Sequence, residues 1–83
     1  MSIGKHDLHH EFPEFHDEIH DLKMNDAHFA RLFNEYHEVN KEVIRIEEGV
    51  ENTTDEYLEQ RKFKRLNLKD NLFVMLKKQK AKA

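Results

Sequence analysis

The chain has 83 residues, which is enough for one small domain. Charged residues make up 37% of it, and it holds two glycines, one proline and no cysteine, which excludes turn-rich sandwiches and barrels, disulfide frameworks and thiolate chemistry. The net charge of −3 hides a separation of charge: residues 1–59 carry 5 Lys and Arg against 16 Asp and Glu, and residues 60–83 carry 9 against 1. We therefore predict an all-α chain that folds back on itself, so that its acidic and basic parts lie side by side.

The first predicted helix covers residues 14–48, after an N-terminal segment, 1–12, that we expect to be partly disordered. Pro13 suits the first turn of a helix, and the acids that follow it favour the positive end of the helix dipole. Asn25-Asp26 is a capping sequence and marks the candidate position for a kink. Apolar residues repeat every seven positions along this segment, which is typical of a coiled coil. The repeating row is Leu8, Phe15, Leu22, Phe29, Tyr36, Val43 and Val50.

A turn is predicted at residues 49–53 and a second helix at 54–78, followed by a frayed tail at 79–83. The turn contains the second glycine and several polar turn formers. Thr53 begins a capping-box pattern, Thr-x-x-Glu, which is typical of a helix N-terminus. The whole chain, 1–83, is therefore predicted to be a single antiparallel two-helix hairpin with coiled-coil character.

Two arginines interrupt the apolar row of the second predicted helix. Arg61 and Arg65 fall in the seam that faces the first helix, where an always-charged guanidinium is half desolvated. An unpaired charge is costly in such a place, so each arginine needs a carboxylate partner, either on the first helix or on a neighbouring chain. Glu42 and Glu47 are the nearest candidates by register. We predict that these four side chains are structural and do not bind a ligand.

Apolar residues are left over on both helices once the hairpin seam is formed. The long first helix extends past the end of the second, and its overhanging face has no partner there. Either the N-terminal segment folds back on the hairpin, or chains associate. Association is the leading hypothesis, so we expect a homo-oligomer, with an unknown protein as a further partner. The interaction residues are Phe12, Phe15, Ile19 and Leu22 on the first arm, and Phe63, Leu66 and Phe73 on the second helix.

All seven histidines lie between His6 and His37, and two of them are one helical turn apart. His16 and His20 have the spacing that binds Zn²⁺ or Ni²⁺ through two imidazoles. The glutamate of a zincin motif has no counterpart, because Asp17 follows the first histidine. We interpret these side chains as surface imidazoles on an acidic helix, and predict no metal site, with His16 and His20 as weak candidates.

The sequence carries no pattern that predicts catalysis. Carboxylates are abundant, but acid–base chemistry needs a concave, desolvated site, and a two-helix hairpin encloses no such cleft. There is no P-loop, no dinucleotide fingerprint and no Ser/His/Asp arrangement that can be placed. We therefore expect no catalytic residues, no cofactor and no enzymatic activity.

The basic C-terminal helix supports a different function. Residues 61–65 are basic except for Phe63, and lysines extend the run to residue 82, a composition compatible with RNA or DNA binding. The hairpin, however, holds the excess acids of residues 1–59 within about a Debye length of this run. We therefore do not expect nucleic acid as a partner. An RNA- or DNA-associated accessory protein that uses the basic helix stays as the alternative function.

Neither a membrane segment nor a leader is expected. The longest apolar run is residues 72–76, against the roughly 18 residues that a membrane span needs. The N-terminus lacks the apolar region of a signal peptide. We expect a cytoplasmic protein without membrane contact.

Five segments of the chain carry a resemblance to a known family: EFPEF at 11–15, DAHFARLF at 26–33, EYHEVNKEV at 35–43, IE at 46–47 and RLNLKDNL at 65–72. Together they resemble the YdcH-like family of small bacterial proteins. The resemblance covers about residues 8–78, and it implies a helical hairpin with coiled-coil character and no established activity, substrate or cofactor. Family members usually have Asp at the position of Asn40. The expected function is thus a small self-associating interaction module without catalytic activity.

Overall fold

The chain is helical almost throughout the part that the structure describes, which confirms the all-α class. The structure is a computed structural model, and it describes residues 8–82. Within this part there is no strand, and no helix is long and apolar enough to cross a membrane. The elements in chain order are α1 (Leu8–Glu11), the 3₁₀ turn η2 (Pro13–Phe15), α2 (His16–Asn25), α3 (Ala27–Glu47) and α4 (Asp55–Lys82).

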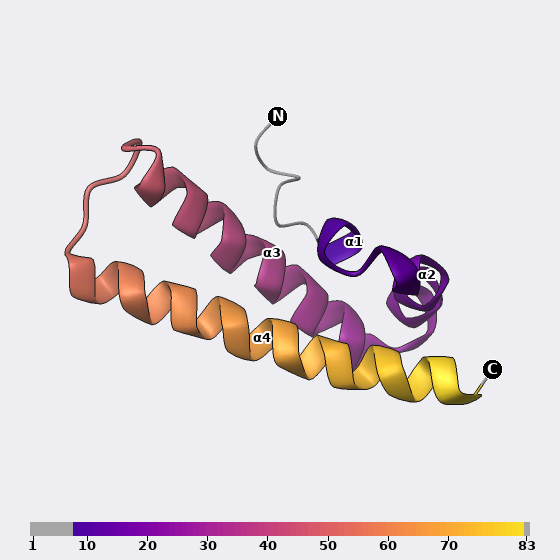
Figure 1. Ribbon diagram of the computed structural model, residues 1–83. Helices are drawn as coiled ribbons and strands as arrows, with labels where there is room; N and C mark the ends of the chain where they lie inside the picture. The colour runs from indigo at the N-terminus through magenta and orange to yellow at the C-terminus, as the bar shows by residue number, and fades with distance from the viewer. Residues whose placement is uncertain (1–7, 83) are drawn as a thin grey trace.

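The two longest helices, α3 and α4, run antiparallel and lie side by side, and the shorter ones turn back against them (Figure 1). The predicted two-helix hairpin is therefore not confirmed, because the first predicted helix is divided into α2 and α3. We call residues 8–25, which comprise α1, η2 and α2, the N-terminal arm. The arm lies against the end of the pair where α3 begins and α4 ends (Figure 1).

Asp26 produces the break between α2 and α3, at the position expected for a kink. Its backbone is extended, with φ −127° and ψ 107°, so the chain changes direction there. Its carboxylate accepts a hydrogen bond from the Phe29 backbone N–H at 3.1 Å, which satisfies one of the free donors at the start of α3. Before the break, the Asn25 side chain donates to the Asp21 carbonyl at 3.0 Å. Local capping by these two residues ends one helix and begins the next.

The connection from α3 to α4 depends on a left-handed glycine. Gly49 has φ +80°, a conformation that L side chains rarely adopt. The Val50 N–H then donates to the Arg45 carbonyl at 2.9 Å, and the Arg45 guanidinium meets Glu51 at 2.7 Å. Helix α4 is capped by Thr54, whose hydroxyl accepts from the Tyr57 N–H at 3.1 Å. The cap is thus one residue later than the predicted Thr53.

The ends of the chain differ from the prediction. Residues 8–11 belong to the segment expected to be partly disordered, but they form α1 and place Leu8 in the core. The first part of that segment, 1–7, lies outside the described residues. Helix α4 continues to Lys82 through most of the segment expected to fray, and only residue 83 of that segment is outside the description.

The core lies where the N-terminal arm meets the α3–α4 pair. Of the two alternatives for the surplus apolar residues, the arm folding back is the one present in the described chain. Polar contacts secure the arm: the Leu8 N–H donates to Nε2 of His37 at 3.2 Å, and Lys69 meets Glu11 at 2.9 Å. The buried apolar residues are Leu8, Phe15, Ile19 and Leu22 from the arm, Phe29, Tyr36, Val39 and Val43 from α3, and Leu68, Leu72 and Leu76 from α4.

The glycine turn can be tested by substitution. No atom lies within 4 Å of a Cβ added at Gly49, so Gly49→Ala meets a backbone penalty alone. We expect it to lower the free energy of unfolding by about 1 kcal/mol in urea denaturation. Gly49→Asn should be milder, because asparagine tolerates the left-handed region better. Equal stability of all three chains would contradict the role of this turn.

The docking of the arm can be tested in the core. Ile19 is fully buried, so Ile19→Ala should destabilise the protein by about 2–5 kcal/mol, measured by thermal or urea unfolding. The control is Met24→Ala on the same helix, where the side chain is 72% exposed, and we expect a change within about 0.5 kcal/mol. If both variants unfold like the parent, the arm does not pack against the pair in solution.

Candidate interaction surface

Glu42 of α3 lies at the centre of a polar cluster between α3 and α4. Nη1 of Arg61 is 3.3 Å from one carboxylate oxygen, and the Tyr57 hydroxyl donates a hydrogen bond to the other. The guanidinium of Arg61 also lies over the Tyr57 ring, 5.6 Å from its centroid. The structure thus brings together Arg61 and Glu42, which the sequence paired by register. Tyr57 was missed, because its place in the first turn of α4 marked it only as a helix-start residue.

This cluster changes the acidity of its members. The hydrogen bond from the Tyr57 hydroxyl is the main reason that the pKa of Glu42 lies below its ordinary value, and Arg61 adds to the effect against partial desolvation. The same hydrogen bond raises the pKa of Tyr57, since its phenolate would face a carboxylate. Glu42 is therefore held as an anion that fastens the start of α4 to α3.

The other two seam residues, Arg65 and Glu47, do not pair with each other in the described chain. Arg65 donates to the side-chain oxygen of Asn40 at 3.0 Å, and Asn40 is almost completely buried. Glu47 pairs with Lys62 at 3.2 Å. Asn40 lies in the buried middle of α3, whereas Glu47 is the last residue of that helix and is exposed. Where a carboxylate partner was predicted for Arg65, the described chain places the amide oxygen of Asn40.

The basic run of α4 meets acidic residues along most of its length. Besides the contacts of Arg61 and Lys62, Nζ of Lys64 is 2.9 Å from Glu35. One turn further on, Lys69 reaches Glu11 of the N-terminal arm at 2.9 Å. These ion pairs are partly exposed, so each contributes little stability by itself. Together, these ion pairs orient the basic side of α4 toward the acidic part of the chain.

The seven predicted interaction residues divide into covered and exposed groups. Three of them, Phe15, Ile19 and Leu22, are buried in the core and are not surface residues of this chain. Two more, Phe12 of the arm and Phe73 of α4, are half-buried by their contact with each other. Their rings stack with centroids 5.1 Å apart. The exposed residues are Phe63, at 65%, and Leu66, at 47%.

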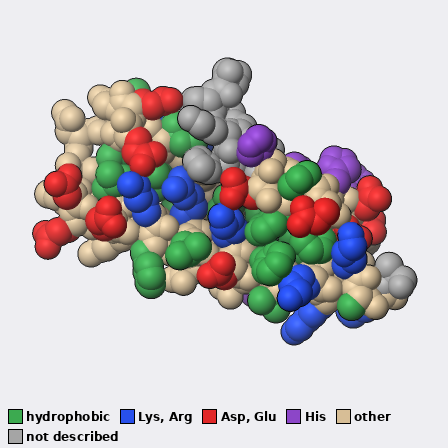
Figure 2. Space-filling view, in the orientation of Figure 1, with side chains coloured by type: hydrophobic (Ala, Val, Ile, Leu, Met, Phe, Trp, Pro, Cys, Tyr) green, Lys and Arg blue, Asp and Glu red, His purple; other side chains and the backbone are tan. Residues whose placement is uncertain are grey.

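One face of α4 carries these exposed apolar side chains. Residues that are three or four positions apart lie on the same side of a helix. On α4, a series of residues with this spacing extends from Phe63 toward both ends of the helix. Val74, which is 50% exposed, lies beside this series and was missed by sequence reasoning. Figure 2 shows apolar side chains interspersed with charged ones along α4. We call this face the α4 strip, and it consists of Glu59, Phe63, Leu66, Asp70, Phe73 and Lys77.

The histidine candidates lie on the exposed surface of α2. His16 and His20 line a shallow depression together with Asp17 and Asp21. The nearest imidazole to His16 is that of His9 in α1, with the two Nδ1 atoms 3.1 Å apart. Within residues 8–82, no group of three or more His, Cys, Asp or Glu side chains is arranged to hold a metal ion. His16 and His20 therefore stay weak candidates.

Comparison with known proteins gives one match. Residues 29–76, more than half of the chain, match the family described as "Protein of unknown function (DUF465)". YdcH is a known member of this family, so the resemblance noted in the sequence is confirmed. The matched residues comprise nearly all of α3 and most of α4, and leave out the N-terminal arm. No curated protein and no solved structure matches the chain.

The lowered pKa of Glu42 predicts how stability depends on pH. The pKa of Glu42 is lower in the folded chain than its ordinary value of 4.5, which holds in the unfolded chain. Such a carboxylate stabilises the fold when the pH is above 4.5. This contribution is lost as pH falls through the lowered folded pKa. The free energy of unfolding of the parent should therefore exceed that of Glu42→Gln most clearly near neutral pH, and the gap should close below about pH 4.

Urea denaturation of both chains at a series of pH values measures this gap. Tyr57→Phe should narrow it, because the hydroxyl is the main cause of the pKa shift. Glu38→Gln, which changes an exposed acid elsewhere on α3, serves as the matched control and should show little pH-dependent difference. A gap of the same size at about pH 7 and pH 3 would show that the Glu42 carboxylate adds no stability of its own.

Proposed function

Because the chain belongs to the DUF465 family, whose function is unknown, we propose a function from its own surface. In this proposal, the protein is a small helical interaction module of the cytoplasm. It associates with further copies of itself and has no catalytic activity. The exposed apolar residues of the α4 strip are the observation that carries this proposal.

Phe63 is the clearest of these residues. A phenylalanine side chain at 65% exposure on a regular helix keeps most of its apolar surface in water, which opposes the hydrophobic effect. Leu66 and Val74 lie on the same helix and are about half exposed. Single exposed apolar residues are ordinary, but a set of them on one helix face is typical of a contact surface. Association through this face would remove them from water.

The arrangement of the acidic residues supports a non-catalytic function. Glu42, Glu47 and Glu35 form ion pairs with side chains of α4, where they have a structural use. A general acid or base acts in a concave, water-excluding site. The depression beside His16 and His20 is shallow, and its four lining residues are exposed. The surface therefore favours binding by contact over chemistry.

The alternative function, RNA or DNA binding by the basic helix, has weaker support. Arg61, Lys62 and Lys64 each form an ion pair with an acidic residue of α3. A phosphate backbone would have to displace these acids, and the excess negative charge of residues 1–59 would oppose its approach. The lysines near the end of α4 are the remaining basis for this alternative.

Self-association can be tested by removing one exposed ring. Light scattering or sedimentation should give a mass near 10.1 kDa at low concentration that rises as protein concentration increases from about 5 to 500 µM. Phe63→Gln should stay close to the monomer mass at every concentration. Its melting temperature should match that of the parent, because Phe63 packs little within the chain.

Met24→Gln is the matched control, because it removes an exposed apolar side chain that belongs to α2 and not to the α4 strip. We expect it to associate like the parent. A parent chain that stays monomeric up to the highest concentration would contradict the proposal. Salt-dependent binding of a short RNA or DNA duplex by that monomer would favour the alternative.

A further inference from the structure

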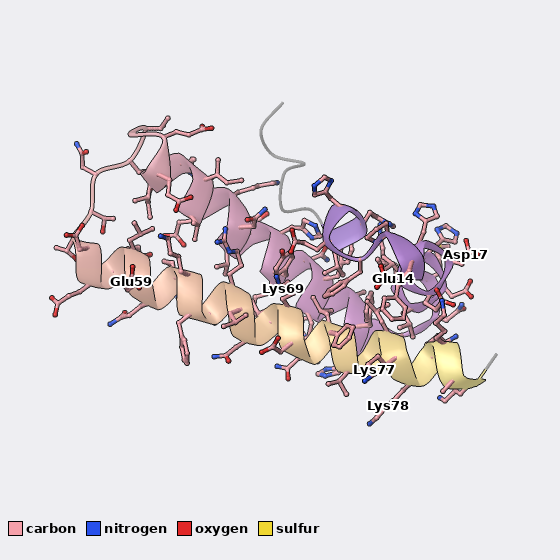
Figure 3. All side chains as sticks on the ribbon, in the orientation of Figure 1. Glu14, Asp17, Glu59, Lys69, Lys77 and Lys78 are labelled. Carbon is pink, nitrogen blue, oxygen red and sulfur yellow. The ribbon has the colours of Figure 1, made fainter. Side chains whose placement is uncertain are left out.

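The charges of the α4 strip are ordered along the helix. Glu59 lies toward its start and Lys77 toward its end, with Phe63, Leu66 and Phe73 between them. Successive members are four, three, four, three and four residues apart, the spacing of a coiled-coil seam. Figure 3 labels Glu59 and Lys77, which lie far apart along α4. Their separation of 18 positions along the chain corresponds to about 27 Å of helix.

We propose that two copies of the chain pair through their α4 strips as antiparallel helices related by a two-fold axis at the level of residue 68. This proposal rests on the self-association proposed above and specifies its geometry. Residues whose numbers add up to 136 then face each other. Glu59 of each copy faces Lys77 of the other, and Phe63 faces Phe73.

The charges distinguish this arrangement from a parallel one. In a parallel, in-register pair, each residue of the strip faces its own counterpart, so that Glu59, Asp70 and Lys77 each meet a like charge. Like charges that face each other across a helix pair are unfavourable and select against that orientation. In the antiparallel pair, two oppositely charged contacts form at the ends of the strip instead. The two-fold axis makes them equivalent, as expected for a symmetric dimer.

The charged groups at the ends are available for such contacts. Glu59 and Lys77 are both exposed. Within residues 8–82, Glu59 has no ion-pair or hydrogen-bond partner. The ammonium of Lys77 lies over the ring of Phe73, 5.3 Å from its centroid, so its stem already follows the apolar part of the strip. An approaching carboxylate would therefore find this ammonium at the edge of the contact.

The N-terminal arm limits how much of the strip is open. Phe12 covers one side of the Phe73 ring, whereas Val74, on the other side of the strip, is 50% exposed. The second copy would therefore contact α4 on the Val74 side at this level. A contact about 27 Å long with so few apolar residues is smaller than a standard protein interface. Association should accordingly be weak and depend on concentration.

A second copy fits this strip better than other occupants. A basic peptide would complement Glu59 and meet repulsion at Lys77, and an acidic peptide would do the reverse. A lipid surface is disfavoured, because Asp70 lies in the middle of the apolar residues. A complementary partner needs a positive charge opposite Glu59 and a negative charge opposite Lys77. A second copy of the strip, running in the opposite direction, has charges in this order. Asp70 faces Leu66 in this pair, a polar seam position that weakens association and helps to set the register.

Charge reversal tests the pairing of Glu59 with Lys77. Glu59→Lys and Lys77→Glu should each raise the dimer dissociation constant roughly tenfold at low salt, because each creates two like-charge contacts. The double variant Glu59→Lys/Lys77→Glu restores opposite charges and the original net charge, so its dissociation constant should return close to that of the parent. Glu38→Lys on α3 is the control for added charge, and it should have little effect. Sedimentation equilibrium measures all five chains.

Cross-linking tests the orientation directly, since the chain has no cysteine of its own. In a mixture of Glu59→Cys and Lys77→Cys chains under mild oxidation, disulfides should join one variant to the other. A parallel pair would instead join Glu59→Cys chains to each other.

The outcomes separate the two proposals. Preferential mixed disulfides together with restoration in the double variant support the antiparallel pair. A parent chain that associates, but whose double variant stays weak and whose Glu59→Cys chains join each other, overturns this geometry and leaves the proposed self-association in place. A parent chain that is monomeric at every concentration overturns both.

Discussion

The packing of the N-terminal arm on the α3–α4 pair is the contact on which the other features depend. Two helices of this length bury too few apolar side chains to make a stable core, and Leu8, Phe15, Ile19 and Leu22 supply what the pair lacks. The extended backbone at Asp26 makes this packing possible, because α2 leaves the axis of α3 and turns back. The arm covers one side of α4 near Phe73, and so determines which face of that helix stays open.

Ion pairs connect the helices at the surface, and apolar contacts connect them in the interior. The basic run of α4 is matched by acids from two other elements, through Glu42 and Glu35 on α3 and through Glu11 on the arm. These pairs hold the register of the helices more than they add stability, because they are partly exposed. The exposed charged residues of the α4 strip do not belong to these ion pairs. The uneven charge of the chain thus directs folding on one side of α4, and the charges of the α4 strip stay exposed on another side.

Features with local causes were predictable from the sequence, whereas those set by tertiary position were not. Asp26 and Gly49 act through their own backbone and side chain, so the break and the turn appear where the pattern places them. Thr53 and Thr54 both satisfy a capping pattern, so the pattern alone does not choose between them. Arg65 was assigned a carboxylate because a half-desolvated charge was expected to need one, whereas its partner in the folded chain is the amide oxygen of Asn40. The candidate site was only half predictable: an amphipathic arm that docks on its own chain and one that docks on another have the same apolar pattern.

The unequal lengths of α3 and α4 have a consequence for cooperativity. Helix α4 has 28 residues and α3 has 21, so the last turns of α4 run past the start of α3 and meet the arm. Lys80 donates there to the Glu14 carbonyl at 3.2 Å and lies over the Phe15 ring. The two ends of the chain therefore make up a single folding unit, although they are 66 residues apart in sequence. Trimming either end removes the same layer of packing, so the two termini should exchange their amide hydrogens with water together, ahead of the centre of the α3–α4 pair.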